Sequence, residues 1–162
     1  MQIHVLVGNP KPHSRTRQVS ETVARKLAGP SDTVTTIDLA DYAAQLFDWN
    51  SEPVNQLVAD VAASDLVIVA SPTFKATYTG LLKAFLDRYQ SQGLQGVVAV
   101  PLMTANDKGH QLASDTHLRP LLVELGASVP TASIFVETPK IDVFDEHLEQ
   151  WLQINQRYLP ND

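Results

Sequence analysis

The sequence contains no cysteine among its 162 residues. This absence excludes a disulfide framework, a thiolate nucleophile and any zinc or iron–sulfur site with cysteine ligands. The sequence also lacks a run of about 18 apolar residues, the length a membrane-spanning helix needs. The first residues show neither the basic region nor the apolar region of a secretory signal. We therefore expect a cytoplasmic protein.

Basic residues are outnumbered by acidic ones: 12 Lys and Arg against 18 Asp and Glu give a net charge of −6. This balance disfavours nucleic acid as a partner, because neutralisation of backbone phosphates dominates such binding. The phosphate-binding motif G-x-x-x-x-G-K-[ST] and the dinucleotide fingerprint G-x-G-x-x-G are both absent, and so is the G-x-S-x-G turn of many hydrolases. These absences exclude a P-loop kinase or GTPase, and the sequence offers no motif that would indicate a hydrolase.

Apolar runs alternate with helical patterns along the chain. The expected strands are residues 2–7, 32–39, 66–70, 97–103 and 129–136, and the expected helices are residues 15–28, 53–64, 78–90, 109–125 and 144–158. Such alternation predicts an α/β protein with a mainly parallel sheet, right-handed crossovers and helices on both faces. Because no linker or repeat interrupts the pattern, we expect a single domain over residues 1–162.

The first expected strand ends at Gly8 and leads into a helix that opens on Ser14, Arg15 and Thr16. The free backbone N–H groups of the first helical turn, the helix dipole, two hydroxyls and a guanidinium can all point at one phosphate. Ser14 and Thr16 could instead simply cap the helix. Because Arg15 lies beside them, we predict a nucleotide or cofactor site here.

Two further loops would reach the same place. In open α/β sheets ligands bind outside the carboxyl ends of the strands, and in the strand order 2-1-3-4-5 the first, third and fourth strands are neighbours. The loop after the third strand, residues 71–77, combines Pro72 and Phe74 with free amides and hydroxyls, which suits a flat heterocycle. The loop after the fourth strand, residues 104–109, offers hydrogen bonds to the polar edge of such a ring.

Three groups of residues carry a resemblance to a known family: residues 8–10 with 14–16, residues 71–83, and residues 94–96 with 101–102. In these segments the chain resembles the NAD(P)H-dependent FMN reductases of the flavodoxin-like class. Among them it is most similar to the flavin reductases that supply reduced FMN to two-component sulfonate monooxygenases. The resemblance extends from Val5 to about Phe135. It implies a flavodoxin-like three-layer sandwich with a five-stranded parallel sheet in the order 2-1-3-4-5.

The resemblance also implies a cofactor and the residues that bind it. FMN would be bound, and residues 14–16 would bind its phosphate. Residues 72–75 would pack against its isoalloxazine ring, and residues 104–107 would contact the far edge of that ring. NADPH or NADH would be the co-substrate, and the protein would be a homodimer or homotetramer. The implied cofactor-binding residues are Asn9, Lys11, Ser14, Arg15, Thr16, Pro72, Thr73, Phe74, Lys75, Thr104, Ala105, Asn106 and Asp107.

The chain departs from the family pattern at three places. Asn9 stands where the family commonly has Ser, and Phe74 where it commonly has Tyr, although Phe keeps the stacking surface. Ala105 and Asn106 replace a Gly-Gly pair. Because glycine lets backbone approach a ring closely, the two added Cβ atoms put the shape of the flavin edge in question.

The implied reaction is hydride transfer from the nicotinamide C4 to N5 of bound FMN, followed by reduction of a second acceptor. That acceptor could be free flavin, a quinone, an azo compound or a partner monooxygenase. We predict no catalytic side chain, because the hydride step needs no acid or base from the protein. We expect no metal site, since His110 and His117 lack the spacing and partners of ligands. Two alternatives stay open: a one-electron flavodoxin-type carrier and a flavin-poor homologue kept for interaction.

Overall fold

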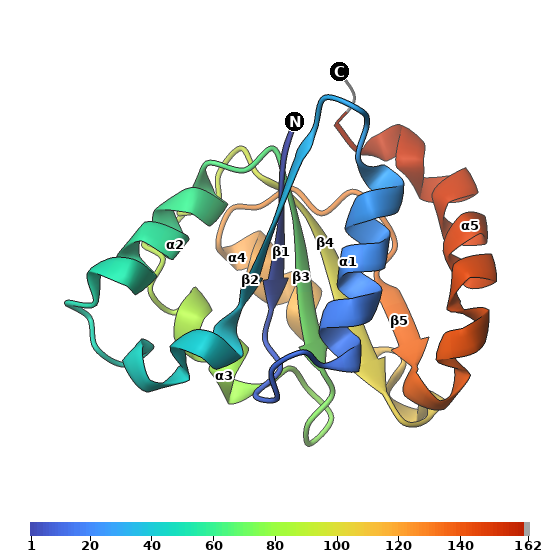
Figure 1. The fold of residues 1–162 in the computed structure, drawn as a ribbon, viewed down its shortest axis with the longest axis horizontal. Helices are drawn as coiled ribbons and strands as arrows, with labels where there is room; N and C mark the ends of the chain where they lie inside the picture. Colours follow the sequence, from blue (N-terminus) through green and yellow to red (C-terminus); the bar gives the residue numbers. More distant parts are fainter. Residues whose placement is uncertain (161–162) are drawn as a thin grey trace.

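The computed structural model describes residues 1–160 and contains one parallel sheet with strands in the order β2-β1-β3-β4-β5. Helices cover both faces of this sheet (Figure 1). The predicted flavodoxin-like fold and strand order are confirmed. The strands are β1 (Gln2–Val7), β2 (Thr33–Asp38), β3 (Leu66–Pro72), β4 (Val98–Ala105) and β5 (Ile134–Glu137), and the α-helices are α1 (Arg15–Leu27), α2 (Glu52–Ala62), α3 (Gly80–Leu86), α4 (Arg119–Glu124) and α5 (Phe144–Asn155).

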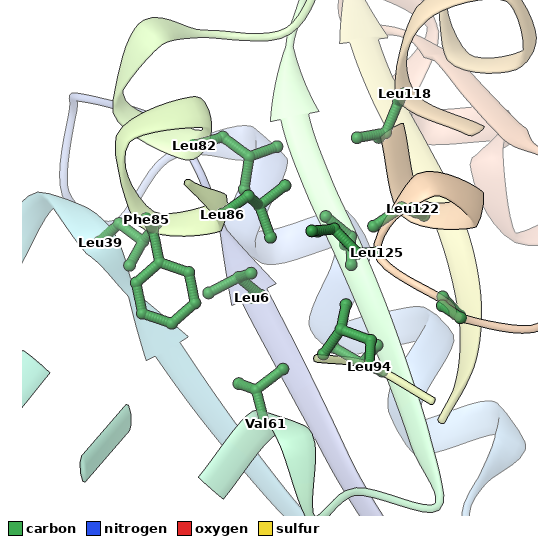
Figure 2. Close-up of a cluster of buried hydrophobic side chains, with 14 of the residues drawn as sticks. Leu6, Leu39, Val61, Leu82, Phe85, Leu86, Leu94, Leu118, Leu122 and Leu125 are labelled. Atoms are coloured by element: carbon green, nitrogen blue, oxygen red, sulfur yellow. The ribbon is translucent and has the colours of Figure 1, made fainter. Parts of the chain in front are cut away.

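Alternating side chains of the central strands build two apolar layers. Ile3, Val5 and Val7 of β1 pack in one cluster with residues of α1 and α5. Leu6 points to the opposite face, where it belongs to a second cluster with residues of α2, α3 and α4. Figure 2 shows this second cluster, with Leu6 below Leu82 of α3. Helices shield both faces of the sheet from water, and for this reason the inner strands consist of continuous runs of apolar residues.

Strands β2 and β4 differ from the expected boundaries by one or two residues at their ends, and the differences at β3 and β5 have identifiable causes. The break expected at Ser71 and Pro72 is wrong, because β3 continues to Pro72, which pairs with Thr104 of β4. Pro72 lies beyond Ala70, where the pairing of β3 with β1 ends, so the N–H that proline lacks is not needed for that ladder. The strand expected at residues 129–136 is shorter, since the Arg119 guanidinium binds the carbonyl oxygens of Val129 and Thr131 at 2.9 and 2.7 Å. Those groups are thereby removed from any sheet ladder.

The prediction of a single helix over residues 109–125 is wrong. This region forms a 3-10 helix (Lys108–His110), a π-helix (Ser114–Leu118) and α4. Pro120 lies in the first turn of α4, and because proline has no N–H the preceding helical ladder cannot run through it. Helix α3 is also shorter than the expected residues 78–90, since Thr79 caps it by accepting a hydrogen bond from the Leu82 N–H at 3.1 Å.

The carboxyl ends of all strands lie at one edge of the sheet, which is the lower edge in Figure 1. Gly8, just after β1, donates to the Ala70 carbonyl of β3 at 2.7 Å and accepts from the Thr79 hydroxyl at 2.5 Å. These two bonds hold the loop after β1 against the end of β3 and the segment that follows it. Within residues 1–160, no helix has the length and apolar character needed to cross a membrane.

Candidate functional site

A cleft of about 520 Å³ opens at this edge of the sheet, within the usual volume of a small-molecule site. Its walls are the loops that follow β1, β3 and β4, as the sequence pattern predicts. All of the candidate binding residues line it except Lys75 and Asp107. The lining residues are Asn9, Lys11, His13, Ser14, Arg15, Thr16, Pro72, Thr73, Phe74, Thr104, Ala105, Asn106 and Thr138.

The first wall is the start of helix α1. The Ser14 hydroxyl caps this helix by accepting from the Arg17 N–H at 3.2 Å. The N–H groups of Arg15 and Thr16 have no partner within the helix, because they belong to its first turn. The charged ends of Lys11 and Arg15 are exposed and have no acidic partner among residues 1–160. This end of the cleft therefore attracts an anion.

Thr16 also ties the start of α1 to the loop after β1 and to the end of β4 beneath the cleft. Its hydroxyl accepts from the Asn9 side-chain amide at 3.0 Å and lies 2.9 Å from the Thr104 hydroxyl. Thr16 and Thr104 are only 1% and 2% exposed. Because this hydroxyl is already engaged, the backbone N–H of Thr16 is the group left to meet an anion.

The second wall follows β3 and carries an aromatic ring. Phe74 is 52% exposed, whereas Pro72 beneath it is buried. The hydroxyl oxygen of Thr73 is buried and has no hydrogen-bond partner among the described residues. An unpaired buried hydroxyl is costly, so a ligand atom that bonds to it would gain affinity. A planar heterocycle could stack its face on the exposed Phe74 ring and place a polar atom of its edge near the Thr73 hydroxyl.

Lys75 lies outside the cleft lining because the chain makes a tight turn there. Lys75 and Ala76 have positive φ angles of 53° and 66°, and the Phe74 N–H donates to the Thr77 carbonyl at 2.9 Å to close the turn. Non-glycine residues rarely adopt this conformation, which costs about 1–3 kcal/mol each and is concentrated at functional sites. The turn places Lys75 at the exposed tip of the second wall.

The third wall follows β4. The side-chain oxygen of Asn106 accepts from the Thr138 hydroxyl at 3.0 Å, which draws this side chain towards the segment after β5. Asp107 does not line the cleft, because its carboxylate accepts from the Gly109 N–H at 2.7 Å and caps the short 3-10 helix. The predicted crowding by Ala105 and Asn106 stays a prediction.

Two lining residues were missed by the sequence interpretation, His13 and Thr138. His13 lies in the predicted first loop with a φ of 52°, and its backbone N–H donates to the Asp38 carboxylate at 3.3 Å. Thr138 follows β5 directly. It could have been found by extending the rule about carboxyl ends of strands to β5. Residues 1–160 hold no cluster of three or more potential metal-ligating side chains.

Comparison with known proteins gives consistent matches. The family model described as NADPH-dependent FMN reductase matches residues 1–139. An "FMN reductase (NADPH)" of Escherichia coli strain K12 is 31% identical over 144 residues, covering 87% of this chain and 75% of that protein. An "NADH-dependent FMN reductase SfnF" of Pseudomonas putida is 26% identical over 154 residues, covering 91% and 81%. A crystal structure of an NADH:FMN oxidoreductase in its apo form superposes with a TM-score of 0.87 at 28% identity, covering 99% of this chain and 91% of that one.

Proposed function

The chain belongs to the NADPH-dependent FMN reductase family, and from that premise we propose that it is an NAD(P)H-dependent FMN reductase that binds FMN in the cleft. The observation that carries this proposal is the single cleft formed by three loops, with an anion site at one end and an exposed aromatic wall at the other. A phosphorylated planar ring needs both features.

The residues of the cleft fit FMN by their chemistry. The cap of α1 with Lys11 and Arg15 would hold the phosphate, and Phe74 would lie against the ring. The unpaired Thr73 hydroxyl would bond to a polar atom of the cofactor. When bound, FMN supplies the hydride-accepting ring and carries the redox chemistry. None of the described lining residues is Asp or Glu, so the protein contributes position and electrostatics without a carboxylate acid or base.

The finer parts of the proposal concern the setting in which the enzyme acts. We propose a single domain over residues 1–162 that acts in the cytoplasm and passes electrons to a small-molecule acceptor or a partner monooxygenase. We also propose a homodimer or homotetramer. Phe47 and Trp49 support self-association, since they are 80% and 60% exposed and large apolar side chains on a surface favour contacts.

The test uses purified protein loaded with FMN. Under anaerobic conditions NADPH or NADH should bleach the flavin absorbance without any other protein. Flavin colour that neither nucleotide bleaches would instead identify a one-electron carrier. A protein that takes up no FMN would identify the flavin-poor homologue. Either result would contradict the proposed reductase.

A further inference from the structure

A second cavity of about 370 Å³ lies beside the first, over the ends of β4 and β5. Its floor is apolar, made by Phe135, Val136 and Phe144, and its lining also includes the exposed Leu112 and several polar side chains. The volume and the mixed lining are those of a small-molecule site. Nothing in the cleft described above uses these residues.

The two cavities share one wall. Ala105, Asn106 and Thr138 line the first cavity, whereas Lys108, Glu137 and Lys140 line the second. The wall is therefore formed by the consecutive segments 105–108 and 137–140, and the hydrogen bond between Asn106 and Thr138 joins these segments. A dinucleotide whose nicotinamide end lies against FMN in the first cavity can place its other end in the second cavity if its diphosphate crosses this wall.

Among the described residues that line the second cavity, one cation, Lys108, lacks an acidic partner. Asp115 accepts from the Arg119 guanidinium at 2.8 Å and from the Ser133 hydroxyl at 2.6 Å. Glu137 is paired with Lys140 at 2.9 Å. Each acid in the lining is thus neutralised by a basic neighbour. Lys108 is exposed and has no acidic partner among residues 1–160.

Two other polar side chains in the lining have no hydrogen-bond partner among the described residues and can bind a ligand. Gln111 and His147 are exposed, and neither side chain has a hydrogen-bond partner among the described residues. Both can donate to phosphate oxygens. The apolar floor, with Phe135 and Phe144, offers a surface for a purine base. The cavity therefore combines an unpaired ammonium, neutral donors and an aromatic floor, which suits a phosphorylated nucleoside.

We propose that the second cavity binds the adenosine end of NADPH, with Lys108 contacting its 2′-phosphate, and that this contact makes the enzyme prefer NADPH to NADH. The inference rests on the proposed function, because it assumes that the nicotinamide lies in the first cleft. NADH has the same adenosine but lacks the 2′-phosphate, so the role of Lys108 can be read from a comparison of the two nucleotides.

The test measures KM for both nucleotides with FMN-loaded protein. Replacing Lys108 by Gln should lower the preference for NADPH over NADH by about tenfold, the loss expected for one charge-assisted contact. Lys108→Glu should lower it further, because the carboxylate repels the phosphate. A Lys26→Ala variant is the control: Lys26 lies in the last turn of α1, remote from both cavities, where its ion pair with Glu149 is exposed.

The outcomes distinguish the two proposals. If neither nucleotide reduces the flavin in unaltered protein, the proposed function itself is wrong. If both nucleotides reduce it and the Lys108 variants keep the original preference, the reductase stands and the assignment of Lys108 is overturned. A parallel rise in both KM values also overturns it, since that result places Lys108 at a phosphate common to both nucleotides.

Discussion

Replacement of Gly8 by Ala tests whether the first loop must pack directly on helix α3. A Cβ added at Gly8 would lie 2.5 Å from the Cβ of Leu82 and 3.3 Å from its Cα. Carbon atoms in good contact are about 3.5–4.0 Å apart, so the chain must move by roughly 1 Å. Leu82 cannot relieve this by a rotamer change, because its Cβ is fixed by the helix backbone.

We expect Gly8→Ala to lower the free energy of unfolding by about 2–3 kcal/mol, the upper part of the range for overpacked cores. This corresponds to a fall of roughly 4–12 °C in Tm for a chain of this size. FMN affinity should fall as well, because the same movement strains the bond from the Thr79 hydroxyl to the Gly8 carbonyl that joins two loops of the cleft.

The assay is thermal and guanidinium unfolding together with a flavin titration. Gly80→Ala is the matched control, since its added Cβ has no atom within 4 Å and the residue begins helix α3. The free energy of unfolding of that variant should rise by about 0.4–1 kcal/mol, because alanine loses less backbone entropy than glycine on folding. The reasoning is refuted if Gly8→Ala unfolds at the same temperature and denaturant concentration as the unaltered protein.

Three further predictions concern the cleft and the sheet beneath it. Arg15→Gln should weaken FMN binding by about 10- to 100-fold and riboflavin binding far less, because riboflavin has no phosphate; equal losses for both ligands in calorimetry would place Arg15 elsewhere. Thr16→Val should lower the free energy of unfolding by about 1–3 kcal/mol, since it leaves the buried Thr104 hydroxyl without its partner; unchanged denaturation would contradict this. Burial lowers the pKa of His4, whose ring nitrogen lies 2.8 Å from the Ser64 hydroxyl, so the unfolded chain binds more protons and stability should fall as pH drops through 6.5. In His4→Gln, denaturation followed against pH should show a smaller fall over this interval.

The alternation of strands and helices could be predicted from the sequence because its signals are local, whereas the strand order was implied by the resemblance to the family. The apolar run of β1, the turn at Gly8 and the capping serine before α1 each specify their own structure. The boundary of β5 that was wrong depends on a distant group. Strand β5 is short because the Arg119 side chain takes carbonyl groups from the preceding segment. A sequence pattern does not reveal which side chain will reach them.

The same division applies to the candidate site. The types of residue in the three loops predicted a phosphate and a planar ring, and the strand order predicted that the loops meet. The sequence did not indicate that the Thr16 hydroxyl would form a hydrogen bond with the Thr104 hydroxyl. It also did not indicate that the Asp107 carboxylate would accept a hydrogen bond from the Gly109 N–H and so cap its own 3-10 helix. Both follow from the directions in which side chains point, which are fixed only when the loops are packed.

The sequence by itself determined the alternation of strands and helices behind the parallel sheet and the residue types that gather at the proposed binding edge, because periodicity and turn chemistry act over a few neighbouring residues. Only the tertiary structure decided which polar groups stay free. Within residues 1–160, Lys108 has no acidic partner whereas Lys140 pairs with Glu137, although both are lysines in polar loops of the same sheet edge. The reason is that a hydrogen bond or ion pair depends on where two side chains end in space, and packing of the whole chain sets that distance.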